Sequence, residues 1–315
     1  MMTRAICVAA MMATMLAAAQ KTYTRDEFRI RDPFVLPDGG VYYLYESQPW
    51  FGGDGVFVRT SRDLENWSEK ERVMKVPEGV KATAFWAPEV HKHNGAYYLF
   101  VTLTEDRAAR PVAPVDPAHA KMAAPRGTWI FKASSPKGPF LPVKMGPVPP
   151  ADWMTLDGTL YVENGQPYMV FCREWIQVGD GQMCYAPLTD DFAAFTEKPV
   201  TFFEASKTMA GAHWVTDGPF FHTSEKGRTL FMIWSNMVKG HGYCVLYRKS
   251  ESGTLAGPWT KDAILFGKNG GHGMIFKAFD GRVMLTLHQP NSGTAERMKL
   301  FTLTDTGTDL VLSDK

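Results

Sequence analysis

Short runs in which apolar and aromatic residues alternate with polar ones cover most of the chain, and turns join these runs in pairs. In the first pair, an apolar run at 32–36 is followed by the turn Pro37-Asp38-Gly39-Gly40 and an aromatic run at 41–45. Two alternating runs around a short turn that contains glycine are typical of a β-hairpin. The same arrangement recurs at 86–100, 156–171, 216–234 and 271–287, so the sequence predicts five similar hairpins.

The spacing of the hairpins predicts the fold. Their opening residues stand 55 to 68 positions apart, and they are Asp32, Glu89, Asp157, Asp217 and His272. Further alternating strands that end in Trp or Phe follow the first four hairpins, at 55–67, 127–140, 181–195 and 242–259. Repeats a little longer than a usual blade of about 40 to 50 residues favour a propeller over a sandwich. We therefore predict an all-β protein, with one five-bladed β-propeller over residues 20–315.

The first twenty residues have a different character. Arg4 carries their only charge, residues 5–16 are small or apolar, and an Ala-x-Ala pattern at 17–19 precedes Gln20. This order is typical of a secretory signal peptide, so we expect residues 1–19 to be removed and the protein to be periplasmic or secreted. The apolar run is shorter than the roughly 20 residues of a membrane-spanning helix, and no span is predicted.

The net charge and the cysteine count limit the classes of partner and the number of disulfides to expect. The formal net charge is +1, which gives no indication of nucleic acid or of a charged membrane surface as partner. Beyond the predicted signal peptide the chain keeps Cys172, Cys184 and Cys244. Three cysteines allow at most one disulfide, between Cys172 and Cys184 on successive strands, and buried free thiols are the alternative.

The opening residues of the hairpins are the candidates for chemistry. The first strand of each propeller blade runs beside the central axis, so residues at the same end of these strands converge on one cavity. Carboxylates that face one another there would have their pKa values pushed apart, which is what acid–base chemistry requires. A lone aspartate before Pro or Gly more often caps a turn. The prediction therefore depends on the equivalent place of Asp32, Asp157 and Asp217 in the repeat.

Five motifs, in this order, resemble those of glycoside hydrolase family 43: Arg31-Asp32-Pro33, Trp86-Ala87-Pro88-Glu89, Leu156-Asp157-Gly158-Thr159-Leu160, Asp217-Gly218-Pro219 and Gly271-His272-Gly273. The resemblance implies a five-bladed propeller that cleaves arabinose- or xylose-containing polysaccharides with inversion and needs no cofactor for the chemistry. It implies that Asp32 is the general base, that Asp157 orients the acid and tunes its pKa, and that Asp217 is the general acid. It also implies that His272 lies near the axis and contacts a metal ion, commonly Ca²⁺, or the waters of that ion.

The chain departs from the family pattern at the acid. The family usually has Glu-Gly-Pro where this chain has Asp217-Gly218-Pro219. Aspartate is one methylene shorter, which would hold the proton donor back by roughly 1 to 1.5 Å, and a shift of that size can cost about a hundredfold in rate. Either the pocket closes in around Asp217, or another acid such as Glu174 donates the proton.

Residues next to these motifs are candidates for substrate contact because apolar sugar faces stack on aromatic rings, while packing in the core is the alternative for each aromatic one. These candidates are Phe85, Trp86, Glu89, Arg173, Glu174, Trp175 and Trp214. A stretch rich in Pro and Ala between Glu105 and Arg126 has no periodicity, and we expect it to be a lid or subsite wall, or else an uninvolved loop.

The sequence thus predicts an exo-type α-L-arabinofuranosidase or β-xylosidase whose substrate is an oligosaccharide or polysaccharide. Two alternatives are a retaining propeller fructosidase, in which Asp32 would be the nucleophile, and a non-catalytic propeller that only binds sugar.

Overall fold

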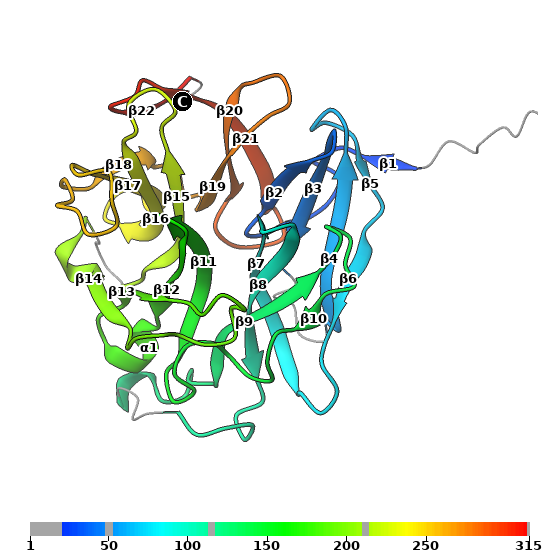
Figure 1. The fold of residues 1–315 in the computed structure, drawn as a ribbon, viewed down its shortest axis with the longest axis vertical. Helices are drawn as coiled ribbons and strands as arrows, with labels where there is room; N and C mark the ends of the chain where they lie inside the picture. Colours follow the sequence, from blue (N-terminus) through cyan, green and yellow to red (C-terminus); the bar gives the residue numbers. More distant parts are fainter. Residues whose placement is uncertain (1–20, 48–52, 113–116, 210–213, 314–315) are drawn as a thin grey trace, which may run out of the picture.

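The computed structural model describes residues 21–47, 53–112, 117–209 and 214–313. Five four-stranded antiparallel sheets are arranged around a central axis, with the strands β2, β7, β11, β15 and β19 innermost (Figure 1). This confirms the predicted all-β, five-bladed propeller. The predicted signal peptide lies outside the described residues and stays a prediction. Within the described ranges, no helix is both long and apolar enough to cross a membrane.

Each blade consists of one continuous stretch of chain, with its strands in sequence order from the axis outward. The first two blades are β2 (Phe34–Asp38), β3 (Val41–Glu46), β4 (Gly55–Ser61) and β6 (Glu71–Lys75), then β7 (Ala82–His93), β8 (Ala96–Glu105), β9 (Arg126–Ala133) and β10 (Leu141–Pro142). The next two are β11 (Thr155–Glu163), β12 (Gln166–Arg173), β13 (Gln182–Pro187) and β14 (Val200–Glu204), then β15 (Asp217–Thr223), β16 (Leu230–Val238), β17 (Gly242–Ser250) and β18 (Ala263–Phe266). The fifth is β19 (Gly271–Lys277), β20 (Val283–Gln289), β21 (Arg297–Asp305) and β22 (Leu310–Leu312).

Few other elements are present in the described part of the chain. A short ladder joins β1 (Thr22–Tyr23) to β5 (Trp67–Ser68), and the only α-helix described is α1 (Trp175–Val178). Two single 3₁₀ turns cover Pro117–His119 and Ala205–Lys207.

Each blade has one residue with a left-handed backbone in or just before its innermost strand, and in four of the five blades a bulge interrupts the ladder there. The residue at this point has a positive φ, between 44° and 54°, and it is Asp32, Ala87, Asp157, Gly218 or His272. In blades 2 to 5 the ladder between the two inner strands shifts its register across this residue and the one that follows. A left-handed conformation costs a non-glycine residue about 1–2 kcal/mol, and such strain is typically kept where function requires it.

The positive-φ position shows that only three of the five opening residues are equivalent in the repeat, whereas the sequence suggested that all five are. Asp32, Asp157 and His272 are indeed at the same position of the repeat, but blade 2 has Ala87 there, and Glu89 follows two residues later. In blade 4 the position belongs to Gly218, and Asp217 precedes it. Glycine is needed at this point for two reasons. The φ is positive, and a Cβ on residue 218 would lie 3.0 Å from the His272 ring.

Ion pairs close the ring between blade 5 and the chain that enters blade 1. Glu296, which is almost fully buried, binds Arg29 at 2.8 Å through one carboxylate oxygen and Arg31 at 2.9 Å through the other. The Tyr42 hydroxyl also accepts a hydrogen bond from the Phe279 amide at 2.9 Å. Because each blade is continuous in sequence, these contacts hold the first and last blades together without exchange of a strand.

We expect Glu296→Gln to destabilise the ring. Breaking a buried ion pair by removing one partner costs about 3–5 kcal/mol, and since both arginines keep some contact with solvent, we expect a loss of about 3 kcal/mol. Urea unfolding followed by tryptophan fluorescence measures this. Glu225→Gln is the matched control, because its ion pair with Lys277 is exposed and should contribute little. Equal midpoints for Glu296→Gln and the wild type would contradict this account of closure.

The cysteines are free and buried, as the simpler interpretation of the sequence predicted. Cys172, Cys184 and Cys244 form no disulfide and pack among apolar residues of the blades. Their role in the fold is therefore that of small apolar side chains.

Candidate active site

The predicted catalytic residues meet in one cavity of about 210 Å³ at the end of the axis where the inner strands bulge. Besides these residues, the cavity is lined by charged and aromatic side chains from all five blades. Its main lining residues are Arg31, Asp32, Trp86, Arg126, Asp157, Glu174, Trp175, Asp217, Tyr243 and His272.

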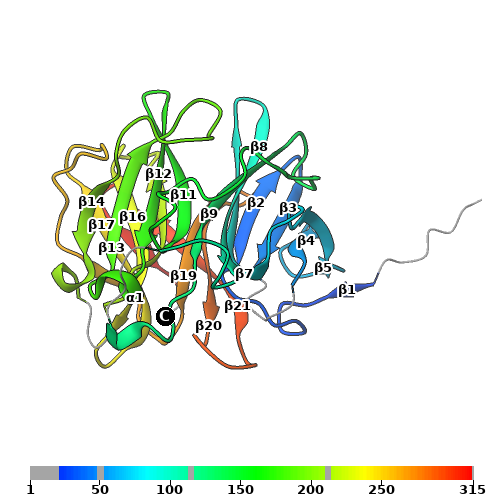
Figure 2. The same ribbon diagram turned by 90° about the horizontal axis from the view of Figure 1, so that it is seen from below.

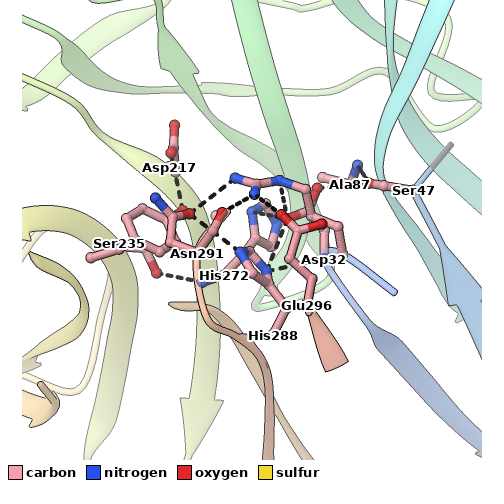
Figure 3. A network of polar contacts seen from close by, with 12 residues as sticks. Asp32, Ser47, Ala87, Asp217, Ser235, His272, His288, Asn291 and Glu296 are labelled. Carbon is pink, nitrogen blue, oxygen red and sulfur yellow. Dashed lines mark hydrogen bonds and ion pairs between the residues drawn. The ribbon is translucent and has the colours of Figure 1, made fainter. Parts of the chain in front are cut away.

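Asp32 is a buried carboxylate that is surrounded by donors (Figure 3). Its Oδ2 accepts a hydrogen bond from the Ser47 hydroxyl at 2.7 Å, and its Oδ1 lies 3.4 Å from Nδ1 of His272 and 3.7 Å from Nε of Arg31. Burial alone would raise the pKa of this carboxyl, but the charges of His272 and Arg31 outweigh that effect and lower the pKa to about 2. Asp32 is therefore ionised at any working pH and can accept a proton.

His288 supports Asp32 as a neutral group. Burial lowers the pKa of His288 to about 3, and its Nδ1 accepts a hydrogen bond from the backbone N–H of Asp32 at 3.2 Å. The ring proton then belongs on Nε2, which faces Oδ1 of Asn291 at 3.4 Å. His288 thus fixes the strained backbone of Asp32 without adding a charge.

Asp157 connects two parts of the site. Its Oδ2 accepts a hydrogen bond from the backbone N–H of Gly218 at 3.0 Å and lies 3.7 Å from Nδ1 of His272. Burial and the negative charges of Asp217 and Asp32 raise the pKa of Asp157 to about 8, against the opposing effect of His272. The carboxyl therefore holds the residue that directly follows Asp217.

Asp217 is held by a hydroxyl. Its Oδ2 accepts a hydrogen bond from the Tyr243 hydroxyl at 3.0 Å. Burial and the charge of Glu174 raise the pKa of Asp217 to about 6, against His272 and Tyr243. Asp157 and Asp217 together therefore retain a proton near neutral pH, whereas Asp32 has none.

His272 is a buried cation among these carboxyls. Burial alone would lower its pKa, but Asp32, Asp157 and Asp217 raise it above the usual value for histidine. Its backbone N–H is held by the Ser235 hydroxyl at 2.7 Å. The ring therefore neutralises part of the negative charge that the cavity collects.

The contacts of His272 do not show the predicted contact with a metal ion. Nδ1 of His272 faces two carboxylates at ion-pair distance, and the described ranges contain no group of three or more His, Cys, Asp or Glu side chains that could hold a metal ion. Calcium prefers six to eight oxygen ligands. The expected Ca²⁺ stays a prediction.

Glu174, the alternative acid, lies in the same cavity but has a different partner. Its carboxylate binds Nη1 of Arg126 at 2.9 Å. Burial raises the pKa of Glu174 while Arg126 opposes that effect. A fixed guanidinium favours the ionised carboxylate, so of the two acids Asp217 is the better placed to carry a proton.

Three of the seven predicted substrate-contact residues line the cavity, namely Trp86, Glu174 and Trp175. Trp86 is fixed by a hydrogen bond from its indole N–H to Oγ1 of Thr104 at 3.0 Å. In the loop that follows Glu105, the 3₁₀ turn Pro117–His119 lies next to α1 (Figure 2), and its His119 packs edge-on against Trp175 with ring centroids 4.7 Å apart. The loop therefore supports a wall of the cavity, in line with the first of its two predicted roles.

The other four predicted contacts are not among the residues that line this cavity. Phe85 is fully buried in the core, because strand alternation directs it away from the side on which Trp86 lies. Glu89 lies behind Asp32 at a separate void of about 10 Å³ and binds His91 at 2.9 Å. Arg173 stacks on Trp153 at 3.9 Å. Trp214 is 41% exposed and does not line the cavity.

Sequence reasoning missed several residues that shape the site. Arg31 stood inside a quoted motif but was given no role, and only its contacts with Asp32 and Glu296 show one. Tyr243 comes from β17, the third strand of its blade, and it reaches the cavity because Gly271 has no Cβ, which would lie 2.4 Å from the Tyr243 ring. A tyrosine in a strand gave no signal that distinguished it from a core residue.

The comparisons with known proteins agree with this geometry. The model of the family described as glycosyl hydrolases family 43 matches residues 27–307. A solved endo-arabinase from Bacteroides thetaiotaomicron is 33% identical, with a TM-score of 0.78, over 90% of this chain and 98% of that one. A thermostable family-43 glycoside hydrolase is 21% identical with a TM-score of 0.76, over 91% of this chain and 93% of that one, which supports the fold alone.

Curated relatives match over shorter segments. An extracellular exo-α-(1→5)-L-arabinofuranosidase from Cellvibrio japonicus is 23% identical over 160 residues, which is 46% of this chain. A probable arabinan endo-1,5-α-L-arabinosidase C from Aspergillus fumigatus is 28% identical over 140 residues, or 41% of this chain. In both cases the match spans 41% of the relative's own length.

Proposed function

The chain belongs to glycosyl hydrolases family 43, and we propose that it hydrolyses α-L-arabinofuranosyl linkages of arabinan by a single displacement with inversion. One observation carries the proposal: three carboxyls share a cavity in which the pKa of one is lowered to about 2 while those of the other two are raised to about 8 and about 6. Carboxyls whose pKa values are separated in this way supply both a base and an acid.

Asp32 is the base in this proposal. Its ionised carboxylate takes a proton from a water molecule as the water oxygen attacks the anomeric carbon. Inverting enzymes keep the two carboxyls about 6.5–9.5 Å apart, which leaves room for that water on the face opposite the leaving group. Ser47 and His272 hold the carboxylate in place.

Asp217 is the acid. As the glycosidic bond breaks, it gives its proton to the leaving oxygen. The Tyr243 hydroxyl donates to Oδ2, so the acidic proton belongs on Oδ1 of Asp217. Asp157 holds the Gly218 amide and thereby fixes the backbone next to the acid. Tyr243 thus holds the short side chain in one position, and Asp157 holds the backbone beside it.

The relatives favour arabinose as the sugar. The solved structure that is 33% identical is described as an endo-arabinase. The relatives from Cellvibrio japonicus and Aspergillus fumigatus are described as acting on arabinofuranosyl or arabinan linkages. An endo-1,4-β-xylanase from Bacteroides thetaiotaomicron is 22% identical, which supports the fold alone. Because the Cellvibrio relative is described as extracellular, we also propose secretion or a periplasmic location, in keeping with the predicted signal peptide.

Sugar release tests the proposal. The protein is incubated with arabinan, arabinoxylan, xylan and aryl glycosides of arabinofuranose and xylose, and the products are separated by chromatography. We expect arabinose or arabino-oligosaccharides from arabinan. Release of xylose alone would favour a xylosidase, and saturable binding without any release would favour a non-catalytic propeller.

The proposal also predicts the pH dependence. The Asp157–Asp217 pair must keep a proton, and because its pKa values are raised, that proton is present at low pH and lost as the pH rises from about 6 to about 8. With a pKa of about 2, Asp32 stays ionised throughout. We therefore expect kcat/KM to be flat on the acid side and to fall above neutrality. A profile that rises to a plateau above pH 8 would contradict the assignment.

A second variant, Tyr243→Phe, tests whether the alkaline limb of this profile reports on Asp217. It removes the hydrogen bond that lowers the pKa of Asp217, so the alkaline limb should move to higher pH. We expect kcat to fall by about tenfold, because a positioning hydrogen bond contributes on the order of 1 kcal/mol. A change in kcat without movement of the limb would show that Tyr243 does not act through Asp217.

A further inference from the structure

The segment 290–296, which joins β20 to β21 in blade 5, carries a residue with no role so far, Asn291, into the polar network around the base (Figure 3). Both ends of the segment are fixed. His288, near the end of β20, is fully buried, and Glu296 binds Arg31 at 2.9 Å. Asn291 is therefore held in a defined position between two groups that contact the base.

Arg31 determines which way the Asn291 amide points. Nη2 of Arg31 donates a hydrogen bond to Oδ1 of Asn291 at 3.2 Å, and Nη1 donates to the backbone carbonyl of the same residue. A guanidinium group has donors but no acceptor, so the side-chain atom that faces it must be the amide oxygen and not the amide nitrogen. The orientation of the amide is therefore fixed by chemistry.

The same amide oxygen selects the tautomer of His288. It lies 3.4 Å from Nε2 of His288, and because the oxygen can only accept, Nε2 must carry the proton. A neutral imidazole has one N–H group, so Nδ1 of His288 is then free to accept. The Tyr243 ring lies alongside the His288 ring, with centroids 5.8 Å apart and an interplanar angle of 27°. This packing and the complete burial of His288 oppose rotation of the ring.

The choice of tautomer matters because Nδ1 of His288 faces two groups of Asp32. It lies 3.2 Å from the backbone nitrogen, whose N–H it accepts, and 3.3 Å from Oδ1 of the carboxylate. In the other tautomer the Nδ1–H group would donate to Oδ1, and the backbone N–H would lose its acceptor. The carboxylate would turn towards His288 and become a weaker base, because a hydrogen bond stabilises its charged form. The backbone of Asp32, strained at a φ of 47°, would also lose a support.

We propose that Asn291 is a positioning residue that acts through His288: it holds the ring proton on Nε2 and so reserves Nδ1 for the backbone N–H of Asp32. The importance of Asp32 for the reaction rests on the proposed function, whereas the position of the ring proton does not. The proposal also gives the contact between blade 5 and the entrance to blade 1 a second role. The arginine that closes the ring orients the amide on which the geometry of the base depends.

Nitrogen-15 NMR of protein labelled at histidine tests the proposal, because protonated and bare ring nitrogens have well-separated shifts. The His288 ring is assigned through its Overhauser contacts with the Tyr243 ring, which packs beside it. We expect the proton on Nε2 in the wild type and in Asn291→Asp, which keeps the acceptor oxygen. We expect it on Nδ1 in Asn291→Leu, or in Asn291→Ala if the leucine variant does not fold. A proton on Nδ1 in the wild type, or an unchanged tautomer in the variant without the oxygen, would overturn the proposal.

Initial rates on an aryl arabinofuranoside test the effect on the base. We expect kcat to fall by about tenfold in Asn291→Leu with little change in KM, and to stay within about threefold of the wild type in Asn291→Asp. Ser292→Leu, at an exposed residue of the same segment, is the matched control and should leave kcat unchanged. An equal loss in Asn291→Leu and Ser292→Leu, or a changed tautomer with an unchanged kcat, would overturn the positioning role.

Failure of the proposed function gives a different result. If the wild type releases no sugar, the backbone amide proton of Asp32 replaces kcat as the second measurement. Its chemical shift should move upfield in Asn291→Leu, because the amide loses its acceptor, and should stay in place in Asn291→Asp and Ser292→Leu. A shift that is the same in Asn291→Leu and the wild type would overturn the proposal even without turnover.

Discussion

Asp32→Asn should reduce kcat on arabino-oligosaccharides by about a thousandfold or more, because it removes the base that activates water. The substitution keeps the size of the side chain, so the hydrogen bond with Ser47 and the fold should survive. Binding of arabinotriose should change little. Initial rates and calorimetric binding on the same preparation measure both quantities.

Glu89→Gln is the matched control for Asp32→Asn. Both carboxylates are buried beside the axis, but Glu89 lies outside the catalytic cavity and binds His91. We expect less than a tenfold fall in kcat for Glu89→Gln, since its charge acts only at a distance, through His272. Equal loss in both variants, or more than a tenth of the wild-type activity in Asp32→Asn, would show that Asp32 is not the base.

Asp217→Asn should give the second large effect, and its size should depend on the leaving group. An arabinose hydroxyl leaves poorly without a proton, so kcat on arabino-oligosaccharides should fall by about 10²–10⁴-fold. A dinitrophenolate leaves readily without a proton, so kcat on dinitrophenyl arabinofuranoside should fall by about tenfold or less. The ratio of these two losses measures the acid role directly.

Glu174→Gln separates the two candidate acids. We expect a similar, moderate fall with both leaving groups, because Glu174 is paired with Arg126 and contributes to binding and to the pKa of Asp217. The leaving-group dependence belongs to whichever residue donates the proton. If Glu174→Gln shows that dependence and Asp217→Asn does not, the acid is Glu174.

The propeller could be predicted from the sequence because its signals are local. The hairpin turn at 37–40 and its counterparts require glycine, asparagine or aspartate, and the inner strands alternate with period two. Closure of the ring gave no such signal. It depends on Arg29, Arg31 and Glu296, which lie more than 260 residues apart and meet only in the folded chain.

The candidate site was predicted less completely. The aspartates at 32, 157 and 217 do converge, but the equivalence of Glu89 and Asp217 with the others was wrong. The bulges in blades 2 to 5 decide which residue occupies the equivalent position, and composition does not reveal where each bulge falls. The neighbours Phe85 and Trp86 show a second limit. Adjacent strand residues point to opposite sides, so a cluster of aromatics next to a motif includes core residues as well as cavity residues.

The anomeric form of the first product tests the central claim most directly. Hydrolysis of an α-L-arabinofuranosyl substrate is followed by proton NMR in its first minutes, before the released sugar mutarotates. With Asp32 as base and Asp217 as acid in a single displacement, the β anomer should appear first and the α anomer only later. If the α anomer appears first, the reaction proceeds with retention through a covalent intermediate, and the inverting account of this cavity is wrong.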